Sequence, residues 1–346
     1  MVRRRRQERA DAAEQLGLPV RELVDHHLLL VPTTVRVELV HTLLRARLPD
    51  SDLLHSGEVR IGRHTRITGP WELSMEDAVD AAVPMPWTVC YVLKTPVERE
   101  GPPWPGLDDR DGFASAFPAG LPWREEGRGL QLIVSLARRL CGAVRTAGTL
   151  QLIQPDPTRA VDHAVHAPYW LQPEALLGLV TRVLPDSHLD IQGSTWRGPS
   201  DEGYAGAAIA AGLADDPLTA DQLAALHAAA DRADAAALQR PQVRDGYAIV
   251  GSLGADGWIE VGARLGEPDQ AAVVGQDWAG QPFVTYSIRW ACPDPREREQ
   301  RAPSPVHLHA RSRASRAAAA IAAVLVEASH GLVTDEDGFW LDRYQL

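Results

Sequence analysis

Two pairs of neighbouring carboxylate and imidazole side chains stand out as groups that could transfer protons or bind a metal. The pair Asp25 and His26 recurs as Asp162 and His163, each at the beginning of an apolar run. Histidine titrates near neutral pH and is the commonest metal ligand, and a neighbouring carboxylate can orient its ring. The pairs are interpreted either as duplicated sites or as the polar first residues of two strands. His166 cannot join His163 in one site, because residues three apart on a strand point to opposite faces.

Two other stretches offer weaker metal-binding patterns. On an extended segment, His307 and His309 would share one face and could chelate a metal such as zinc. The acidic run Asp108-Asp109-x-Asp111-Gly112 resembles part of a calcium loop, but it lacks the closing glutamate and is interpreted as a solvated turn. The sequence therefore predicts no metal and no cofactor.

The connection between Thr95 and Arg124 is the segment most suited to contact a ligand. It carries four aromatic residues, Trp104, Phe113, Phe117 and Trp123. Connections of this length without secondary structure of their own are usually functional or disordered, and exposed aromatic side chains imply burial or a partner. We expect this segment either to fold over a sheet as a lid or to touch a ligand.

The strong catalytic signatures are absent from the sequence. There is no Gly-x-x-x-x-Gly-Lys loop, no Gly-x-Gly-x-x-Gly fingerprint, no Gly-x-Ser-x-Gly elbow and no His-Glu-x-x-His motif. The glycine-rich stretch 251–254 falls at a predicted hairpin and is interpreted as a tight turn. No catalytic, cofactor-binding or metal-binding residue is predicted, and an enzymatic activity is left open without being favoured.

The elements that must position these residues occur twice. Val24-Asp25-His26 recurs 137 residues later as Val161-Asp162-His163, and Leu48-Pro49-Asp50-Ser51 recurs 136 residues later as Leu184-Pro185-Asp186-Ser187. Between these matches, the runs 26–31 and 162–167 are typical of strands, and apolar residues at i, i+3, i+4 and i+8 indicate one helix in each copy. We interpret the pattern as an internal duplication. The alternative is two unrelated strand–helix units with similar ends.

Later elements also have counterparts. Apolar strands are predicted at 87–93 and 286–292, and a second helix follows each of them, with apolar faces over 130–141 and 321–328. Each of these helices is expected to end at a glycine in the left-handed conformation, Gly142 or Gly331, before a last strand.

The second copy is longer than the first. Residues 196–242 have no counterpart in the first copy and are predicted to be mostly helical. Thr219-x-x-Gln222 is interpreted as a capping box within this insertion, as is Ser74-x-x-Asp77 in the first copy. A hairpin is predicted over 247–265, with Asp256-Gly257 at its turn.

The element order predicts an α+β fold. Each copy reads strand–helix–strand, strand–helix–strand, which is the order of the ferredoxin-like fold, an antiparallel sheet with its helices on one face. We predict two tandem ferredoxin-like (βαββαβ) units from an internal duplication. The expected boundaries are an N-terminal helix or tail over 1–22, a first repeat over 23–155, and a second repeat over 160–346 with a helical insertion at 196–242. A single larger sheet built from both halves is the alternative.

Composition limits the classes of function. The net charge of −11 argues against a general nucleic-acid binder, and Arg3 to Arg6 are interpreted as a solvated terminus. Cys90, Cys141 and Cys292 form no CxxC pair and are expected to be free buried thiols, which suits a reducing compartment. No apolar segment resembles a signal peptide or spans a bilayer. A cytoplasmic protein is expected, with neither nucleic acid nor membrane as a partner.

Three functions are compatible with these observations. The favoured one is a non-catalytic cytoplasmic protein that acts as a scaffold, binds a protein partner or associates with itself. The alternative is an enzyme or small-ligand-binding protein whose site lies in the cleft between the two repeats. The candidate residues of that cleft are Asp25, His26, Trp104, Asp111, His163 and His166. Nucleic-acid binding through Arg3 to Arg6 and one sheet face is the third possibility.

Overall fold

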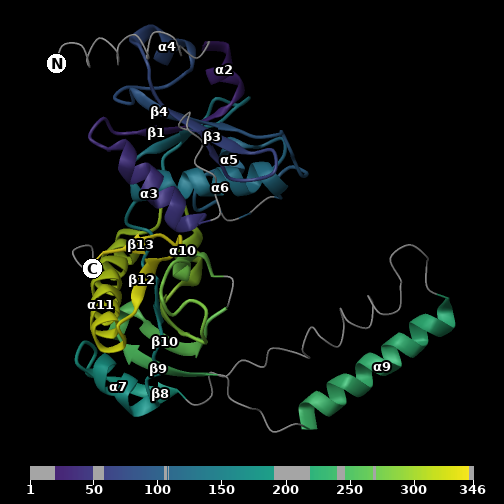
Figure 1. Cartoon of the computed structure of the whole chain (residues 1–346), viewed down its shortest axis with the longest axis vertical. Coiled ribbons are helices and arrows are strands. Elements are labelled where there is room, and N and C mark those ends of the chain that lie inside the picture. The colour runs from purple at the N-terminus through teal and green to yellow at the C-terminus, as the bar shows by residue number, and fades with distance from the viewer. Residues whose placement is uncertain are drawn as a thin grey trace.

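The computed structural model describes residues 20–49, 58–104, 107, 109–190, 219–239, 246–267 and 270–342. The helix expected over residues 3–16 and the first part of the insertion, up to residue 218, lie outside these described residues. The described chain is a mixed α and β protein with two separate antiparallel sheets, so the alternative of one sheet built from both halves is wrong. Figure 1 shows the two sheets in succession along the long axis of the molecule.

The first sheet has six strands in the order β2-β3-β4-β1-β5-β6. These strands are β1 (His27–Val31), β2 (Glu58–Arg60), β3 (Arg66–Glu72), β4 (Val89–Lys94), β5 (Ala143–Arg145) and β6 (Leu152–Ile153). The central strand β1 pairs antiparallel with β4 on one side and with β5 on the other.

Helices cover both faces of this sheet, whereas the element order predicts them on one face only. The helices α3 (Val37–Arg47) and α6 (Arg124–Arg139) pack on the face that carries Leu29. The helices α2 (Val20–Asp25) and α4 (Met75–Asp80) pack on the opposite face, which carries Leu28 and Leu30. The reason lies in β1, whose three consecutive leucines point alternately to the two faces, so that both must be covered.

The second sheet has seven strands in the order β13-β12-β7-β11-β10-β9-β8. These strands are β7 (His163–Ala167), β8 (Ser187–Asp190), β9 (Gly246–Ser252), β10 (Trp258–Leu265), β11 (Val284–Ala291), β12 (Leu332–Asp335) and β13 (Trp340–Leu341). The helices α7 (Pro173–Thr181) and α11 (Pro305–Ser329) bury one face, where apolar residues of β7, β10 and β11 form a second core. The opposite face of this sheet carries the exposed side chains of Glu260, Arg264 and Arg289.

His307 and His309 lie in the first turns of α11 and not on an extended stretch. The hydroxyl of Ser304 accepts a hydrogen bond from the His307 N–H at 3.2 Å, and Pro305 occupies the first helical position. Residues two apart on a helix point away from each other, because each residue turns the direction by about 100°. The pair therefore lacks the shared strand face that chelation of a metal would need.

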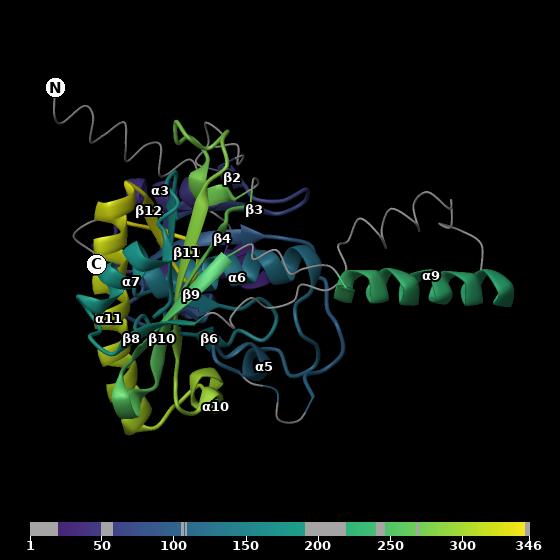
Figure 2. The ribbon, with the colours of Figure 1, turned by 90° about the horizontal axis from the view of Figure 1, so that it is seen from below.

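Local signals in the second half and in α4 are confirmed. The capping box of Ser74 and Asp77 is present, with the Asp77 N–H donating to Ser74 Oγ at 3.0 Å. Thr219 and Gln222 exchange the same pair of bonds at the beginning of α9 (Ala220–Gln239). The hairpin of β9 and β10 turns at Gly257, which has a φ of 92°. In Figures 1 and 2, α9 stands away from both sheets.

The glycines expected in the left-handed conformation are not the residues that adopt it. Cys141 and His330, one position earlier in each case, both have a φ of 52°. Cys141 is consequently exposed at the end of α6, not buried as expected, whereas Cys90 and Cys292 are buried free thiols.

The two halves pack directly against each other. Phe339, in the turn between β12 and β13, is fully buried in the core formed by α3, α6 and the first sheet. The short 3₁₀ turn η2 (Ala271–Val273) also contacts α3. None of the described helices is long and apolar enough to cross a membrane.

Candidate binding cavity

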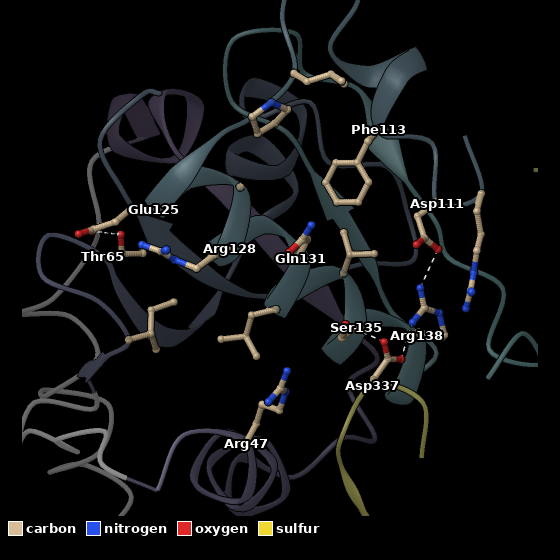
Figure 3. A pocket seen from close by; sticks show the side chains of 18 of the residues that line it. Arg47, Thr65, Asp111, Phe113, Glu125, Arg128, Gln131, Ser135, Arg138 and Asp337 are labelled. Carbon is tan, nitrogen blue, oxygen red and sulfur yellow. Dashed lines mark hydrogen bonds and ion pairs between the residues drawn. The ribbon is translucent and has the colours of Figure 1, made fainter. Parts of the chain in front are cut away.

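A cavity of about 840 Å³ lies where the two halves and the 95–124 connection meet (Figure 3). Its walls come from the end of α3, the β2–β3 turn, the connection, α6, the end of α10 (Pro295–Glu299) and the β12–β13 turn. The lining therefore combines segments that are far apart in the sequence. Such junctions are common places for small-molecule sites.

Helix α6 forms one wall because its two faces differ. Leu130, Ile133 and Ala137 point into the core of the first half. The other face presents Arg128, Gln131, Leu132 and Ser135 to the cavity, at the spacing i, i+3, i+4 and i+7 of one helical face.

A buried polar cluster fixes the beginning of α6. Glu126 is inaccessible to solvent, forms an ion pair with Arg99 Nη2 at 2.6 Å and accepts a hydrogen bond from the Glu98 N–H at 2.8 Å. In return, the Glu98 carboxylate accepts the Glu125 N–H at 2.8 Å and so satisfies one free donor of the first turn. These bonds join the start of the 95–124 connection to the helix.

His27 completes this cluster from β1. Its Nδ1 accepts the Ala147 N–H at 2.9 Å, so Nε2 carries the hydrogen and donates it to Glu126 Oε1 at 3.0 Å. Burial lowers the pKa of His27, although Glu126 partly offsets this effect. The ring is therefore a neutral structural donor. Phe117 of the connection is buried in the core with its ring centre 6.1 Å from that of His27, and Arg99 lies 4.3 Å from the centre of the Phe117 ring.

Ion pairs close the opposite end of the cavity. The nearly buried Arg138 binds Asp111 at 2.6 Å and also pairs with Asp337, which accepts the Ser135 hydroxyl at 3.0 Å. Burial lowers the pKa of Arg138, but Asp337 and Asp111 outweigh burial and raise it above the ordinary arginine value. Arg110 binds Glu336 of the second half at 2.6 Å. These contacts connect the 95–124 connection and α6 to the β12–β13 turn.

Two further carboxylates of the wall are held by neutral donors. Glu125 accepts the Thr65 hydroxyl at 2.7 Å and the His64 N–H at 2.9 Å, and the bond from Thr65 is the main cause that lowers the pKa of Glu125. Asp109 accepts the N–H groups of Ala114 and Ser115 at the start of α5 (Phe113–Ala116). Both carboxylates therefore already accept hydrogen bonds from groups of the protein.

Three arginines of the lining differ from Arg110 and Arg138. The guanidinium groups of Arg47, Arg63 and Arg128 make no hydrogen bond or ion pair with any residue that the structure describes. The Arg47 side chain lies against Gly338 of the second half, since a Cβ on that glycine would be 3.4 Å from Arg47 Nε. In Figure 3, Arg47 and Arg128 enter the cavity from different sides.

Of the six residues predicted for a cleft between the halves, only Asp111 lines the cavity, together with Asp109 and Phe113 of the same connection. Trp104 is 67% exposed outside it, Asp25 is exposed, and His26 is half-buried at the start of β1. His163 and His166 are buried in the second half, away from the cavity lining.

The histidines of β7 have structural surroundings. The ring of His166 lies between the hydroxyls of Thr285 and Thr334, at 3.1 and 3.3 Å, and its pKa is lowered by burial to about 4. Asp162 accepts the Trp290 N–H and pairs with Arg298, so it acts as a link between strands and loop. Within the described residues, no three histidine, cysteine or carboxylate side chains form a group that could hold a metal ion.

The arginines of the cavity were not predicted from the sequence. A partial signal was present for Arg138, because it follows Leu136 and Ala137 on a helix and has to be buried or paired. No local pattern marks Arg47 or Arg128, which face the cavity only because α3 and α6 come together. Comparison with family models, with curated proteins and with solved structures finds no match for this chain.

Proposed function

We propose that this protein is a non-catalytic binding protein that holds a small molecule in the cavity between its two halves. The observation that carries the proposal is the cavity itself, about 840 Å³ in volume and lined by both halves and the 95–124 connection. Pockets of roughly 300–1,000 Å³ are typical of small-molecule sites.

The chemistry of the described lining favours binding over catalysis. General acid–base work requires a titratable group that is free to exchange a proton with a ligand. Asp111 and Asp337 are tied to Arg138, and Glu125 accepts two hydrogen bonds from its neighbours. The Ser135 hydroxyl donates to Asp337 and has no histidine beside it among the lining residues.

A fragment screen by ligand-observed NMR tests this proposal. Gln131 lines the cavity with an exposed side chain, so Gln131→Trp is expected to fill the cavity and abolish the binding of fragments that bind the wild type. Leu39→Trp, at an exposed position on α3 outside the lining, is the matched control and should bind them unchanged. Fragment binding that persists in Gln131→Trp, or a complete lack of hits, would contradict the proposal.

A protein-association role is the second candidate, favoured by the exposed part of the second sheet around Trp258. Trp258 is 48% exposed there, on the same face of β10 as Glu260 and Arg264. Exposed aromatics beside charged groups are typical of interaction surfaces. Light scattering on the purified protein tests this role. An oligomer that dissociates in Trp258→Ser supports it, and a strict monomer at all concentrations contradicts self-association.

We also propose that the two halves descend from one duplicated ferredoxin-like unit. The central strands support this origin, because β5-β1-β4-β3 and β12-β7-β11-β10 follow the same order relative to the chain. The strands β1 and β7 begin 136 residues apart, at His27 and His163, which equals the offset of the following helices in the sequence. The second sheet has one strand more than the first, because β8 pairs with β9 at its edge.

The cytoplasm is the proposed location. Cys90 and Cys292 are buried free thiols, and Cys141 is an exposed one. Thiols of this kind persist in a reducing compartment.

A further inference from the structure

We infer that the ligand of the cavity is a small organic anion, a carboxylate or a phosphate ester on an apolar body, bound by Arg47 and Arg128. This inference rests on the proposed binding function and specifies its ligand.

The pairing of charges around the cavity supports an anion. Six carboxylates and five guanidinium groups line the cavity, so the total charge of the wall does not decide the question. The carboxylates of Asp109, Asp111, Glu125, Glu336 and Asp337 already accept hydrogen bonds from protein donors. Of the guanidinium groups, only those of Arg110 and Arg138 are paired within the described residues. Among the described residues, only one lining carboxylate, Glu299, has no hydrogen-bond or ion-pair partner, whereas three guanidinium groups have none, so the unpaired groups favour an anion over a cation.

Two of the free arginines, Arg47 and Arg128, border the same cavity, and Figure 3 shows the Arg128 side chain extended towards Thr65 and Glu125. Arg47 comes from the last turn of α3, and Arg128 comes from the second turn of α6, so the two arrive from different walls. A planar guanidinium presents paired donors that match the oxygens of a carboxylate or phosphate. Arg63, from the β2–β3 turn, lines the same cavity and adds a third free cation.

An apolar surface lies beside these donors. Ile61, Phe113 and Leu132 line the cavity and are half-buried against the core of the first half. Phe113 also packs against Phe117, with ring centres 6.5 Å apart, so its position is fixed. An apolar ligand body would be removed from water on this surface while its acidic group reaches the arginines.

The experiment uses three probes that differ only in the group that meets the arginines. Benzoate and phenyl phosphate carry the anion, and benzamide is a neutral analogue of similar shape. By isothermal titration calorimetry on the full chain, we expect both anions to bind at least about tenfold more tightly than benzamide. Preference for phenyl phosphate over benzoate, or the reverse, identifies which oxyanion the site takes.

Matched variants assign the effect to the two arginines. Arg128→Gln and Arg47→Gln are exposed changes that should leave the fold intact and weaken benzoate and phenyl phosphate binding by at least about tenfold each. Arg45→Gln, exposed on α3 but outside the lining, is the control and should bind like the wild type.

The outcomes separate this inference from the proposed function. Equal binding of benzamide and the anions, or anion binding that both arginine variants retain, overturns the anion assignment and leaves the cavity as a binding site. If all three probes fail to bind while the fragment screen still yields hits that Gln131→Trp abolishes, the anion assignment is also overturned and the cavity remains a binding site. Failure of both experiments removes the binding function as well.

Discussion

A Cβ placed on Gly142 would lie 2.3 Å from the carbonyl oxygen of Leu30, so the end of α6 rests directly on the backbone of β1. The same relationship occurs in the second half, where a Cβ on Gly331 would lie 2.5 Å from the carbonyl oxygen of His166. Leu30 and His166 are each the fourth residue of the central strand. In both halves the residue before the glycine adopts the left-handed conformation. The two halves thus use one steric arrangement to dock the second helix on the first strand.

Alanine at either glycine should therefore destabilise the protein. Gly142→Ala and Gly331→Ala force a methyl group against a strand carbonyl, and overpacking of this kind costs about 1–3 kcal/mol. Urea unfolding of the two variants measures the loss. Gly178→Ala is the control, because its Cβ would meet nothing within 4 Å in the middle of α7, where alanine should add up to about 1 kcal/mol of stability. Equal stabilities of Gly142→Ala and the wild type would refute the close approach.

Replacing Cys141, the left-handed residue before Gly142, with glycine should increase the stability of the protein. Cys141 has a φ of 52°, and this conformation costs a residue with a Cβ about 1–2 kcal/mol, whereas glycine adopts it freely. After the larger entropy of glycine in the unfolded chain is subtracted, Cys141→Gly should gain about 0.5–1 kcal/mol. Cys141→Ala keeps the Cβ and should show no comparable gain. Thermal unfolding of both variants makes the comparison.

Elements set by local patterns could be predicted from the sequence. The strands after His26 and Asp162, the capping boxes at Ser74 and Thr219, and the turn at Gly257 follow from periodicity, caps and turn residues that act within a few positions. Features that depend on contacts between distant segments could not be predicted. One such feature is that Cys141, and not Gly142, adopts the left-handed conformation. Its reason is the close approach of Gly142 to β1, which no local pattern shows.

The cavity shows the same limit. In the sequence, Arg47 and Arg128 are ordinary charged residues of two helices. They line the same cavity only because α3 and α6 pack together. Asp111 was singled out because the 95–124 connection is long and acidic, which is a local observation. The burial of Phe339 in the core of the other half has no local signal.

Asp335 should make the stability of the protein depend on pH. Burial is the main cause that raises the pKa of this carboxyl to about 6, with Asp337 raising it further and Arg139 and the Phe339 N–H lowering it. A carboxyl whose folded-state pKa exceeds its unfolded value of about 3.9 stabilises the fold below that value, and the contribution is lost as the pH rises through about 6. The loss is on the order of 2–3 kcal/mol, at about 1.4 kcal/mol for each pKa unit.

Asp335→Asn isolates this contribution. The asparagine keeps an oxygen for the Phe339 N–H, which now donates to Asp335 Oδ1 at 2.9 Å, and it carries no charge at any pH. We expect the variant to be more stable than the wild type at pH 7.5, with the difference shrinking towards pH 4, as measured by urea unfolding across this range. Asp80→Asn, at an exposed position on α4, should follow the wild-type profile. A constant difference between Asp335→Asn and the wild type from pH 4 to 7.5 would sink the prediction.

Phe339 should stabilise the half of the chain to which it does not belong. Its ring is fully buried among residues of α3, α6 and the first sheet, so Phe339→Ala leaves a cavity there and should cost about 3–5 kcal/mol. Hydrogen exchange should become faster in α3 and α6, because their packing is loosened, and less so in α7 on the far sheet. Trp104→Ala, at a tryptophan that is 67% exposed, is the control with a small expected effect. Loss of protection confined to the second sheet would mean that the two halves fold independently of this contact.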